Sequence, residues 1–354
     1  MSNINLKRFV DINIQKQVEP VVVGTRDTTV LFVVSSTIAE HTISSYEEAT
    51  QYYDENADLL SYCKMYFDNG GAKLLVKPIA AISSLQAEIG KLDDKYICIT
   101  CLDNATEMVK VATTRAANDA IYGINEKLLI TRTTDKTFAT AVKNLITKYS
   151  SVTGAEMTIA AYLSQINVYG IDTIYDYAFT QEVIASEDEL TNDEYATLVE
   201  KNNVNVDIFL ANATRNCGGN CTDGADIVNN FVRIILHQTL TDRLLNLLTT
   251  KLKNSTGISK IYTVMTDELE KYKTSGYLTI DKIWTKDTLK IDYNGTAYTI
   301  IEQGTPLTNG YFIKVLPLSS LTESDKLAHK APLIYVIIAD QYGIRKITIH
   351  GDVI

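Results

Sequence analysis

"LIYVIIADQYGIRKITIHGDVI", from Leu333 to Ile354, contains two strand-like runs separated by a short turn. The first run, Leu333 to Ala339, is apolar at nearly every position, which predicts a strand covered on both faces and central in its sheet. From Arg345 onward apolar and polar residues alternate, which is typical of a strand with one buried face. This second strand reaches Ile354, the last residue of the sequence, so the question is what it pairs with.

Another strand-like run lies near the other end of the chain, in "RFVDINIQKQVEP", Arg8 to Pro20. Val10, Ile12 and Ile14 fall on one face of this predicted strand, and Pro20 breaks the pattern. Chain termini are usually frayed polar tails unless something holds them. Two β-competent ends therefore indicate either edge strands folded onto their own domain or strands that pair with another chain, and the pattern alone leaves both open.

The composition is that of an ordinary globular protein. The chain has 354 residues, of which 45% are hydrophobic, and this length is enough for two or three domains. The formal net charge of -10 argues against nucleic acid as a partner, because phosphate binding needs clustered Lys and Arg. The first residues lack the apolar core of a signal peptide, and no apolar run approaches the roughly 20 residues that span a bilayer. We therefore expect synthesis in the cytoplasm and no direct membrane insertion.

Residues 28–150 alternate between strand-like and helix-like stretches. Short apolar runs rich in β-branched residues predict strands at 28–36, 73–79, 96–102 and 127–133. Amphipathic stretches predict helices at 45–71, 83–90, 105–122 and 136–149. Because these strands are apolar nearly throughout, the sequence predicts a mostly parallel sheet with helices on both faces.

The middle of the chain is less regular. Residues 157–203 are interpreted as irregular or inserted, and 205–213 as one more buried strand. The glycine-rich stretch "RNCGGNCTDGAD" indicates a loop, which leads into predicted helices at 225–252 and 266–275.

The pattern changes to period two near the C-terminus. "LKIDYNGTAYTIIE", Leu289 to Glu302, predicts a hairpin that turns at Asn294 and Gly295. "GYFIKVLPL" predicts a further strand, and a short polar helix is predicted at 322–329.

The rhythm of strands and helices is shared with nucleotide-binding enzymes, but the sequence lacks their phosphate-binding motifs. A dinucleotide fold needs glycines directly after its first strand, and "LFVVSSTIAEHT" has none. No Walker A motif occurs. Three glycines precede a predicted helix without the Lys and hydroxyl of a P-loop, which favours a plain loop: Gly218, Gly219 and Gly224.

Metal binding and catalysis are not indicated either. The four histidines show no ligand spacing: His41, His237, His329 and His350. The five cysteines are an odd number at unpaired spacings, which fits a reducing compartment without disulfides: Cys63, Cys98, Cys101, Cys217 and Cys221. No nucleophile lies beside a plausible base. We expect no enzyme activity, no cofactor and no metal.

Three stretches carry a resemblance to a known family. "AHKAPLIYVIIADQYGIRKITIHGDVI", which begins at Ala328, resembles the C-terminal signature of contractile tail sheath proteins, found in phages with contractile tails and in phage-tail-like bacteriocins. "FVDINI", from Phe9, is similar to the family's opening strand. "SYEEATQYYDENADLLSYCKMYFDNGGAKLLVKPI", from Ser45, resembles its early helix, Gly-rich step and strand. Length and acidity resemble a compact sheath of the bacteriocin type, such as a clostridial diffocin. The chain departs from the family at "QYGIRKI", where an Ala-Ile-His step is common.

The resemblance implies an α/β fold of the mixed α+β kind. Its sheath-type assembly domain is built from both chain termini and carries an inserted or outer domain and extended β-strand arms. The implied division is an N-terminal arm and linker strand at 1–27, an α/β body with a variable outer portion at 28–203, the C-terminal part of the sheath domain at 204–338 and a C-terminal arm strand at 339–354. The arms are expected to add strands to sheets of neighbouring subunits.

The resemblance also assigns roles to individual residues. The donated strands are expected to pair through Val10, Ile12, Ile14, Lys346, Ile347, Ile349 and Val353. The receiving strand is expected to contain Leu333, Tyr335 and Ile337. In relatives a short helix before the C-terminal strands faces the inner tube, which here gives tube contacts at Asp325, Lys326 and Lys330.

The implied function is that of a structural subunit. It would polymerise helically around an inner tube and contract to drive the tube through a target cell envelope, without a nucleotide. Its partners would be further copies of itself, the inner tube protein, and baseplate and tail-terminator or collar proteins. It would be made in the bacterial cytoplasm and become part of a released phage tail or bacteriocin particle.

Other interpretations stay open at this point. A Rossmann-like α/β enzyme with an unrecognised site predicts a monomer or small oligomer with a ligand pocket at the strand C-termini. A different structural assembly, such as a tube, baseplate or surface-layer subunit, is a second, although the long α/β body argues against a small β-rich tube subunit. The charges at 322–330 are alternatively only the solvated face of a helix.

Overall fold

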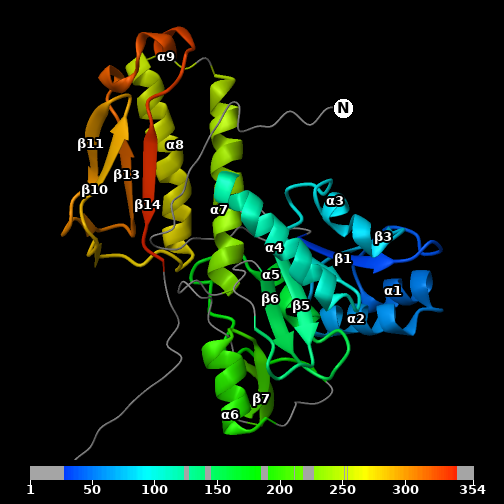
Figure 1. The fold of residues 1–354 in the computed structure, drawn as a ribbon. Coiled ribbons are helices and arrows are strands. Elements are labelled where there is room, and N and C mark those ends of the chain that lie inside the picture. The colour runs from blue at the N-terminus through cyan, green and yellow to red at the C-terminus, as the bar shows by residue number, and fades with distance from the viewer. Residues whose placement is uncertain are drawn as a thin grey trace, which may run out of the picture.

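The structure is a computed structural model, and it describes residues 28–122, 127–139, 145–184, 190–210, 212–217, 227–250, 252 and 254–340. Within these residues a sheet region, 28–217, and a C-terminal region, 254–340, are joined by the long helix α7 (Ile227–Leu248) (Figure 1). The expected arm at 1–27, and all but two residues of that at 339–354, lie outside the described residues.

Six strands form one mixed sheet in the order β2-β3-β1-β4-β5-β6. They are β1 (Thr29–Val34), β2 (His41–Ile43), β3 (Leu74–Ile79), β4 (Cys98–Cys101), β5 (Leu128–Thr133) and β6 (Leu145–Tyr149). Every pairing is parallel except that of β2 with β3 at one edge. The central strands are buried almost throughout, as their continuous apolar runs predict. The mostly parallel sheet predicted from the sequence is confirmed.

Helices cover both faces of this sheet (Figure 1). One face packs against α1 (Tyr46–Tyr53), α2 (Ala57–Asp68), α5 (Met157–Gln165) and α7. The other packs against α3 (Leu85–Ile89) and α4 (Ala105–Tyr122), with a short 3-10 turn at Ile82–Ser84. Because successive strand residues point to opposite faces, Leu31 of β1 joins the first core and Phe32 joins the second.

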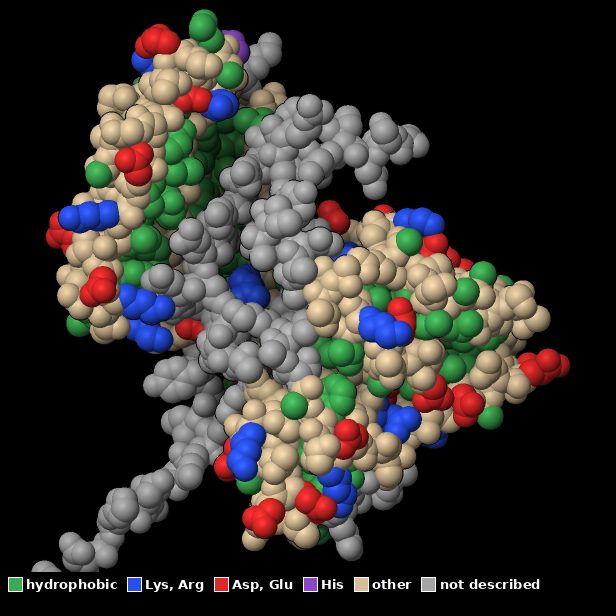
Figure 2. Space-filling model, viewed as in Figure 1, with side chains coloured by type: hydrophobic (Ala, Val, Ile, Leu, Met, Phe, Trp, Pro, Cys, Tyr) green, Lys and Arg blue, Asp and Glu red, His purple; other side chains and the backbone are tan. Residues whose placement is uncertain are grey.

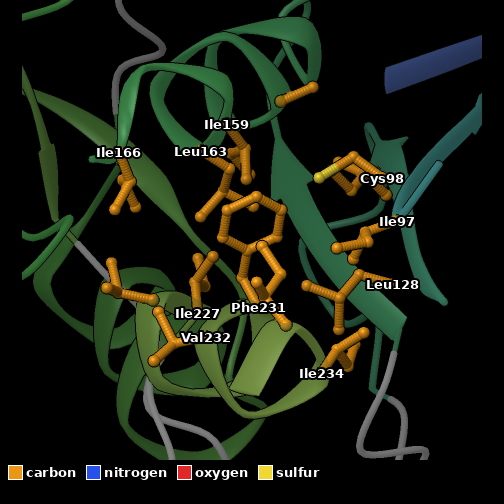
Figure 3. Close-up of a cluster of buried hydrophobic side chains, with 14 of the residues drawn as sticks. Ile97, Cys98, Leu128, Ile159, Leu163, Ile166, Ile227, Phe231, Val232 and Ile234 are labelled. Carbon is orange, nitrogen blue, oxygen red and sulfur yellow. The ribbon is translucent and has the colours of Figure 1, made fainter. Parts of the chain in front are cut away.

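The first of these cores, called the main core here, is built around helix α7. Phe231 is only 1% exposed and lies among Leu163 of α5 and Leu128 of β5 (Figure 3). The same core continues into the C-terminal region, where it includes Val336 and Ile338. The sheet region and the C-terminal region therefore share one hydrophobic core.

Some sequence predictions between residues 136 and 217 were wrong. Residues 145–149, expected at the end of a helix, form β6, whose sequence LITKY is buried at every position. Residues 157–165, interpreted as irregular, form the buried helix α5. Residues 215–217, expected at the start of a loop, belong to β8 (Ala213–Cys217). In each case burial against neighbouring elements decides the conformation, and local sequence pattern does not reveal that burial.

Beside β6 lies a small unit, called the β7–β8 unit here and covering the described residues from 190 to 217. It contains α6 (Asn192–Tyr195), a π-helical turn at Ala196–Lys201, and the antiparallel hairpin of β7 (Val206–Leu210) and β8. Asn205 ties it to the sheet, since its N–H donates to Thr147 O and its carbonyl accepts from Tyr149 N–H. The β7–β8 unit thus continues the sheet at its β6 edge.

The C-terminal region begins with α8 (Asn254–Thr274), which packs along α7 and is longer than the predicted 266–275. It continues with β9 (Lys282–Ile283), β10 (Leu289–Tyr293), β11 (Thr296–Ile301), β12 (Pro306–Leu307), β13 (Tyr311–Val315), a 3-10 turn at Leu318–Ser320, α9 (Glu323–Leu327) and β14 (Ile334–Ile338). Three antiparallel pairs result, β9 with β12, β10 with β11 and β13 with β14. Asn294 and Gly295 both have positive φ, 54° and 76°, which confirms the predicted two-residue hairpin turn.

Within the described residues, no helix is both long and apolar enough to cross a bilayer, and no cluster of three or more His, Cys, Asp or Glu side chains could hold a metal ion. The four cysteines in this part of the chain are buried and form no disulfide.

The main core yields a stability prediction. Phe231→Ala removes a buried ring from the centre of that core, so we expect it to lower the free energy of unfolding by about 3–5 kcal/mol. Phe209→Ala is the matched control, because Phe209 is 62% exposed and its loss should change the free energy by no more than about 0.5 kcal/mol. Urea unfolding of dilute protein measures both. Equal effects of the two substitutions would contradict the placement of α7.

Candidate assembly site

Strand β14 is apolar on both faces, and each face belongs to a different core. Val336 and Ile338 are 7% and 2% exposed and join the main core, which α8 also lines through Met265 and Leu269. The alternate residues point the other way. The continuous run "LIYVIIA" therefore forms a strand covered on both faces, as the sequence predicted. Its predicted central place in a sheet is not seen within the described residues, where β14 pairs with β13 alone.

The second face of β14 belongs to a separate cluster, called the hairpin core here. Ile337 and Ala339 are buried in it beside Trp284. Leu333 and Tyr335 are half-buried against the same cluster, and burial raises the pKa of the Tyr335 hydroxyl. The three residues expected in the receiving strand, Leu333, Tyr335 and Ile337, thus point together into the hairpin core.

The main-chain N–H and C=O groups of β14 also alternate along the strand, pointing to one edge and then to the other. Leu316 N–H donates to Leu333 O, and Ala339 N–H donates to Gly310 O. In an antiparallel pair every second residue exchanges both hydrogen bonds with its partner, so Tyr335 and Ile337 bond to β13. It follows that the main-chain groups of Ile334, Val336 and Ile338 point to the opposite edge.

No strand within the described residues pairs with that opposite edge, because β13 and β14 form a two-stranded sheet there. Figure 1 shows β14 in front of α8, with β13 on one side of it. Figure 2 shows hydrophobic side chains gathered along this flank of the C-terminal region. A free strand edge beside apolar side chains is a template for another strand.

The residues expected to donate strands lie outside the described residues. They are Val10, Ile12, Ile14, Lys346, Ile347, Ile349 and Val353. The structure therefore describes the expected receiving strand without the strands that it would receive.

The charged residues expected at the tube lie on or just after α9. Asp325 closes this helix at its N-terminus: its Oδ2 accepts from Thr322 N–H at 3.2 Å, and its own N–H donates to Thr322 Oγ1 at 3.1 Å. The same carboxylate accepts from Asn294 Nδ2 at 3.1 Å, which ties α9 to the turn of the β10–β11 hairpin. Asp325 is therefore only 8% exposed.

The two lysines are exposed but already paired. Lys330 Nζ lies 2.7 Å from Asp325 Oδ1, and Lys326 Nζ lies 2.6 Å from Glu323 Oε1. The Lys330 and Thr322 contacts hold the pKa of Asp325 well below its usual range, and the pKa of Lys330 is raised in return. These charges are thus balanced within the α9 segment.

Two features of this segment were missed in the sequence. Leu327 is 80% exposed, the largest exposed fraction among the large hydrophobic residues described. The tie between Asn294 and Asp325 joins residues 31 positions apart, so local pattern gave no sign of it. The capping box could have been found, since "TESD" places Thr and Asp at the spacing that closes a helix start.

Comparison with known proteins agrees with this geometry. Residues 228–353 match the family described as E217 tail sheath protein gp31-like, C-terminal domain. This range contains nearly all of α7 and every element of the C-terminal region. No curated protein sequence matches the chain.

Two solved structures have the same fold over nearly the whole chain. A chain in the cryo-EM structure of the anti-feeding prophage (AFP) baseplate, 6-fold symmetrised, has a TM-score of 0.67 at 15% identity, covering 97% of this chain and 98% of that one. A chain in the AFP baseplate in the contracted state has a TM-score of 0.59 at 10% identity, covering 97% of each chain. The resemblance predicted from the sequence is confirmed: residues 228–353 carry the gp31-like C-terminal domain of tail sheath proteins.

Proposed function

We propose that the chain is a structural subunit of a contractile tail sheath, which polymerises helically around an inner tube and contracts to drive the tube through a target cell envelope. The match of residues 228–353 to the tail sheath domain carries this proposal. Similarity of fold to chains of an AFP baseplate supports it, because that particle is a prophage assembly with a contracted state. An enzyme function has no comparable support.

Strand exchange is the proposed link between subunits. Val10, Ile12 and Ile14, and the alternating residues from Lys346 to Val353, would add strands at the free edges of the β13–β14 pair in neighbouring subunits. Ile334, Val336 and Ile338 present main-chain groups at one such edge. Each strand adds a few hydrogen bonds worth about 1 kcal/mol net apiece, together with apolar burial. Many such links in a closed array hold strongly, because each one raises the local concentration for the next.

Contraction is proposed as a rigid-body change of lattice. The shared main core holds the sheet region and the C-terminal region together, so the subunit moves as one body. Linkers near 17–27 and 339–343 would absorb the rotation while the exchanged strands stay paired. Energy stored in packing between subunits would drive the change. The other proposed partners are the baseplate and the tail-terminator or collar proteins.

The first prediction from the proposed function concerns the C-terminal strand. A chain that ends at Gly343 lacks the proposed donated strand, so we expect it to stay monomeric where the full-length chain forms tubes or long polymers. Light scattering and negative-stain electron microscopy measure the difference, and circular dichroism confirms that the shortened chain is folded. If both chains are equally monomeric over a wide concentration range, the strand closes its own fold and the proposal is lost.

The second prediction concerns the free edge of β14. Ile334→Pro removes an N–H that points away from β13, and proline is tolerated on strand edges that lack a partner. We expect this variant to remain folded but to lose polymer formation. Ile334→Ala is the matched control, since it removes the same side chain and keeps the N–H, and it should polymerise. Polymer formation by both variants would show that this edge receives no strand.

The third prediction concerns the tube. Asp325, Lys326 and Lys330 are proposed to lie at weak, breakable contacts with the inner tube protein, since exposed ion pairs contribute little individually. Lys326→Glu should leave sheath polymers intact and reduce their co-sedimentation with tubes. Lys290→Glu changes an exposed lysine on β10 instead and should have no such effect. Unchanged co-sedimentation of the Lys326 variant would mean that these charges only solvate α9.

A further inference from the structure

A cluster of buried ionisable side chains joins the sheet to the β7–β8 unit, and the proposed function makes no use of it. Lys148 belongs to β6, Asp207 to β7, and Glu182 to the segment between α5 and α6. Their exposed fractions are 0%, 5% and 6%. One cation therefore lies with two carboxyl groups in a site that excludes solvent.

The amine of Lys148 contacts both carboxyl groups. Its Nζ lies 2.9 Å from Asp207 Oδ1 and forms an ion pair with Glu182 Oε2. It also donates to Thr158 Oγ1 at 2.8 Å. Tyr177 Oη donates to the other oxygen of Glu182 and fixes the orientation of that carboxyl group.

Asp207 differs from Glu182 in how its oxygens are engaged. Neither oxygen accepts a well-aligned hydrogen bond from the described residues, although Lys148 is within ion-pair distance. A buried carboxylate without hydrogen bonds is costly as an anion. Burial is the main cause that raises the pKa of Asp207 to about 7, and the charge of Glu182 adds to it while Lys148 opposes it. The site therefore shifts Asp207 toward its neutral form beside the ammonium group of Lys148.

We propose that Lys148 and Asp207 condense to an intramolecular isopeptide bond, with Glu182 as the catalytic acid and base. The geometry carries this proposal: nucleophile, electrophile and proton carrier are in contact in one dry site. No cofactor or second reactant is needed.

The reaction balances as a simple condensation. Lys148 passes a proton from its ammonium group to Glu182, and the neutral Nζ attacks Cγ of protonated Asp207. Protonated Glu182 then gives its proton to the leaving hydroxyl group and takes another proton from the nitrogen. The Cγ–O bond breaks, one water leaves, and the N–Cγ amide remains beside a protonated Glu182. No group is oxidised or reduced.

The fold supplies the two conditions that the reaction requires. Lys148 pairs with Asn205 in a parallel bridge, so β6 and the start of β7 hold amine and acid in fixed positions. Reactants held in this way reach effective molarities of about 10⁵–10⁸ M. Exclusion of water opposes the reverse hydrolysis. Burial lowers the pKa of Lys148, but the charges of Glu182 and Asp207 raise it overall, so the proton transfer to Glu182 is the step that frees the amine.

The bond would fasten the β7–β8 unit to the sheet covalently. It crosses from residue 148 to residue 207, far apart in the sequence, and would persist in denaturant. This inference does not depend on the sheath function, because it concerns only the chemistry of one folded chain.

Intact-mass spectrometry of the full-length protein in denaturant tests the proposal. We expect the wild-type chain to be lighter than its sequence mass by one water, and tryptic digestion to give a branched peptide in which Lys148 is not cleaved and is joined to Asp207. A wild-type mass equal to the sequence mass would overturn the proposal. So would a water loss confined to a single linear peptide, which indicates dehydration elsewhere.

Three variants test the roles of the residues. Asp207→Ala removes the carboxyl group that would react, so this variant should keep the full sequence mass. Glu182→Gln leaves both Lys148 and Asp207 in place, and it should also keep the full sequence mass because the proton carrier is lost. Glu194→Gln is the matched control, because Glu194 pairs with Lys136 on the surface, and it should still lose one water. A Glu182→Gln chain that loses water as completely as the wild type would remove the catalytic role from Glu182.

Discussion

One hydrophobic core, built around helix α7, is the constraint on which the rest of the structure depends. It begins at the sheet with residues such as Leu31 and Leu128 and ends at β14 with Val336 and Ile338. Closely packed interiors have low compressibility, so a displacement of one element is passed on to the elements packed against it. The position of β14 is therefore set by the sheet region through α7 and α8. Under the proposed contraction, such a subunit would change its contacts with neighbours by moving as a whole.

Much of the fold could be predicted from the sequence, because several elements carry their own signals. Local sequence patterns predict the buried strands of the sheet, the turn at Asn294 and Gly295, and the strand with two apolar faces. The candidate assembly site could be predicted from the sequence only in part. The run from Leu333 to Ala339 indicated a doubly covered strand, whereas the choice of edge depends on hydrogen bonds to residues near Gly310 and Leu316 that no local pattern specifies.

The features that were missed depend on contacts between distant residues. Lys148 sits in a run whose length and composition fit a helix, and its burial becomes clear only when Glu182 and Asp207 are brought to it. The role of Asp325 is similar, since it appears in the sequence as a surface charge and is engaged by the distant Asn294. Charged residues are rarely buried without partners, so their placement is fixed by tertiary structure and not by periodicity.

The division of β14 into two side-chain faces and one edge that no described strand occupies has a consequence for compatibility between chains. Both faces are already filled by the chain's own cores, so in the proposed strand exchange an incoming strand would meet mainly N–H and C=O groups, which are identical in every protein. Binding of this kind depends more on the length and extended conformation of the incoming strand than on its side chains. Under the proposed strand exchange, subunits from diverged lineages would still build mixed polymers after their outer surfaces have ceased to resemble one another.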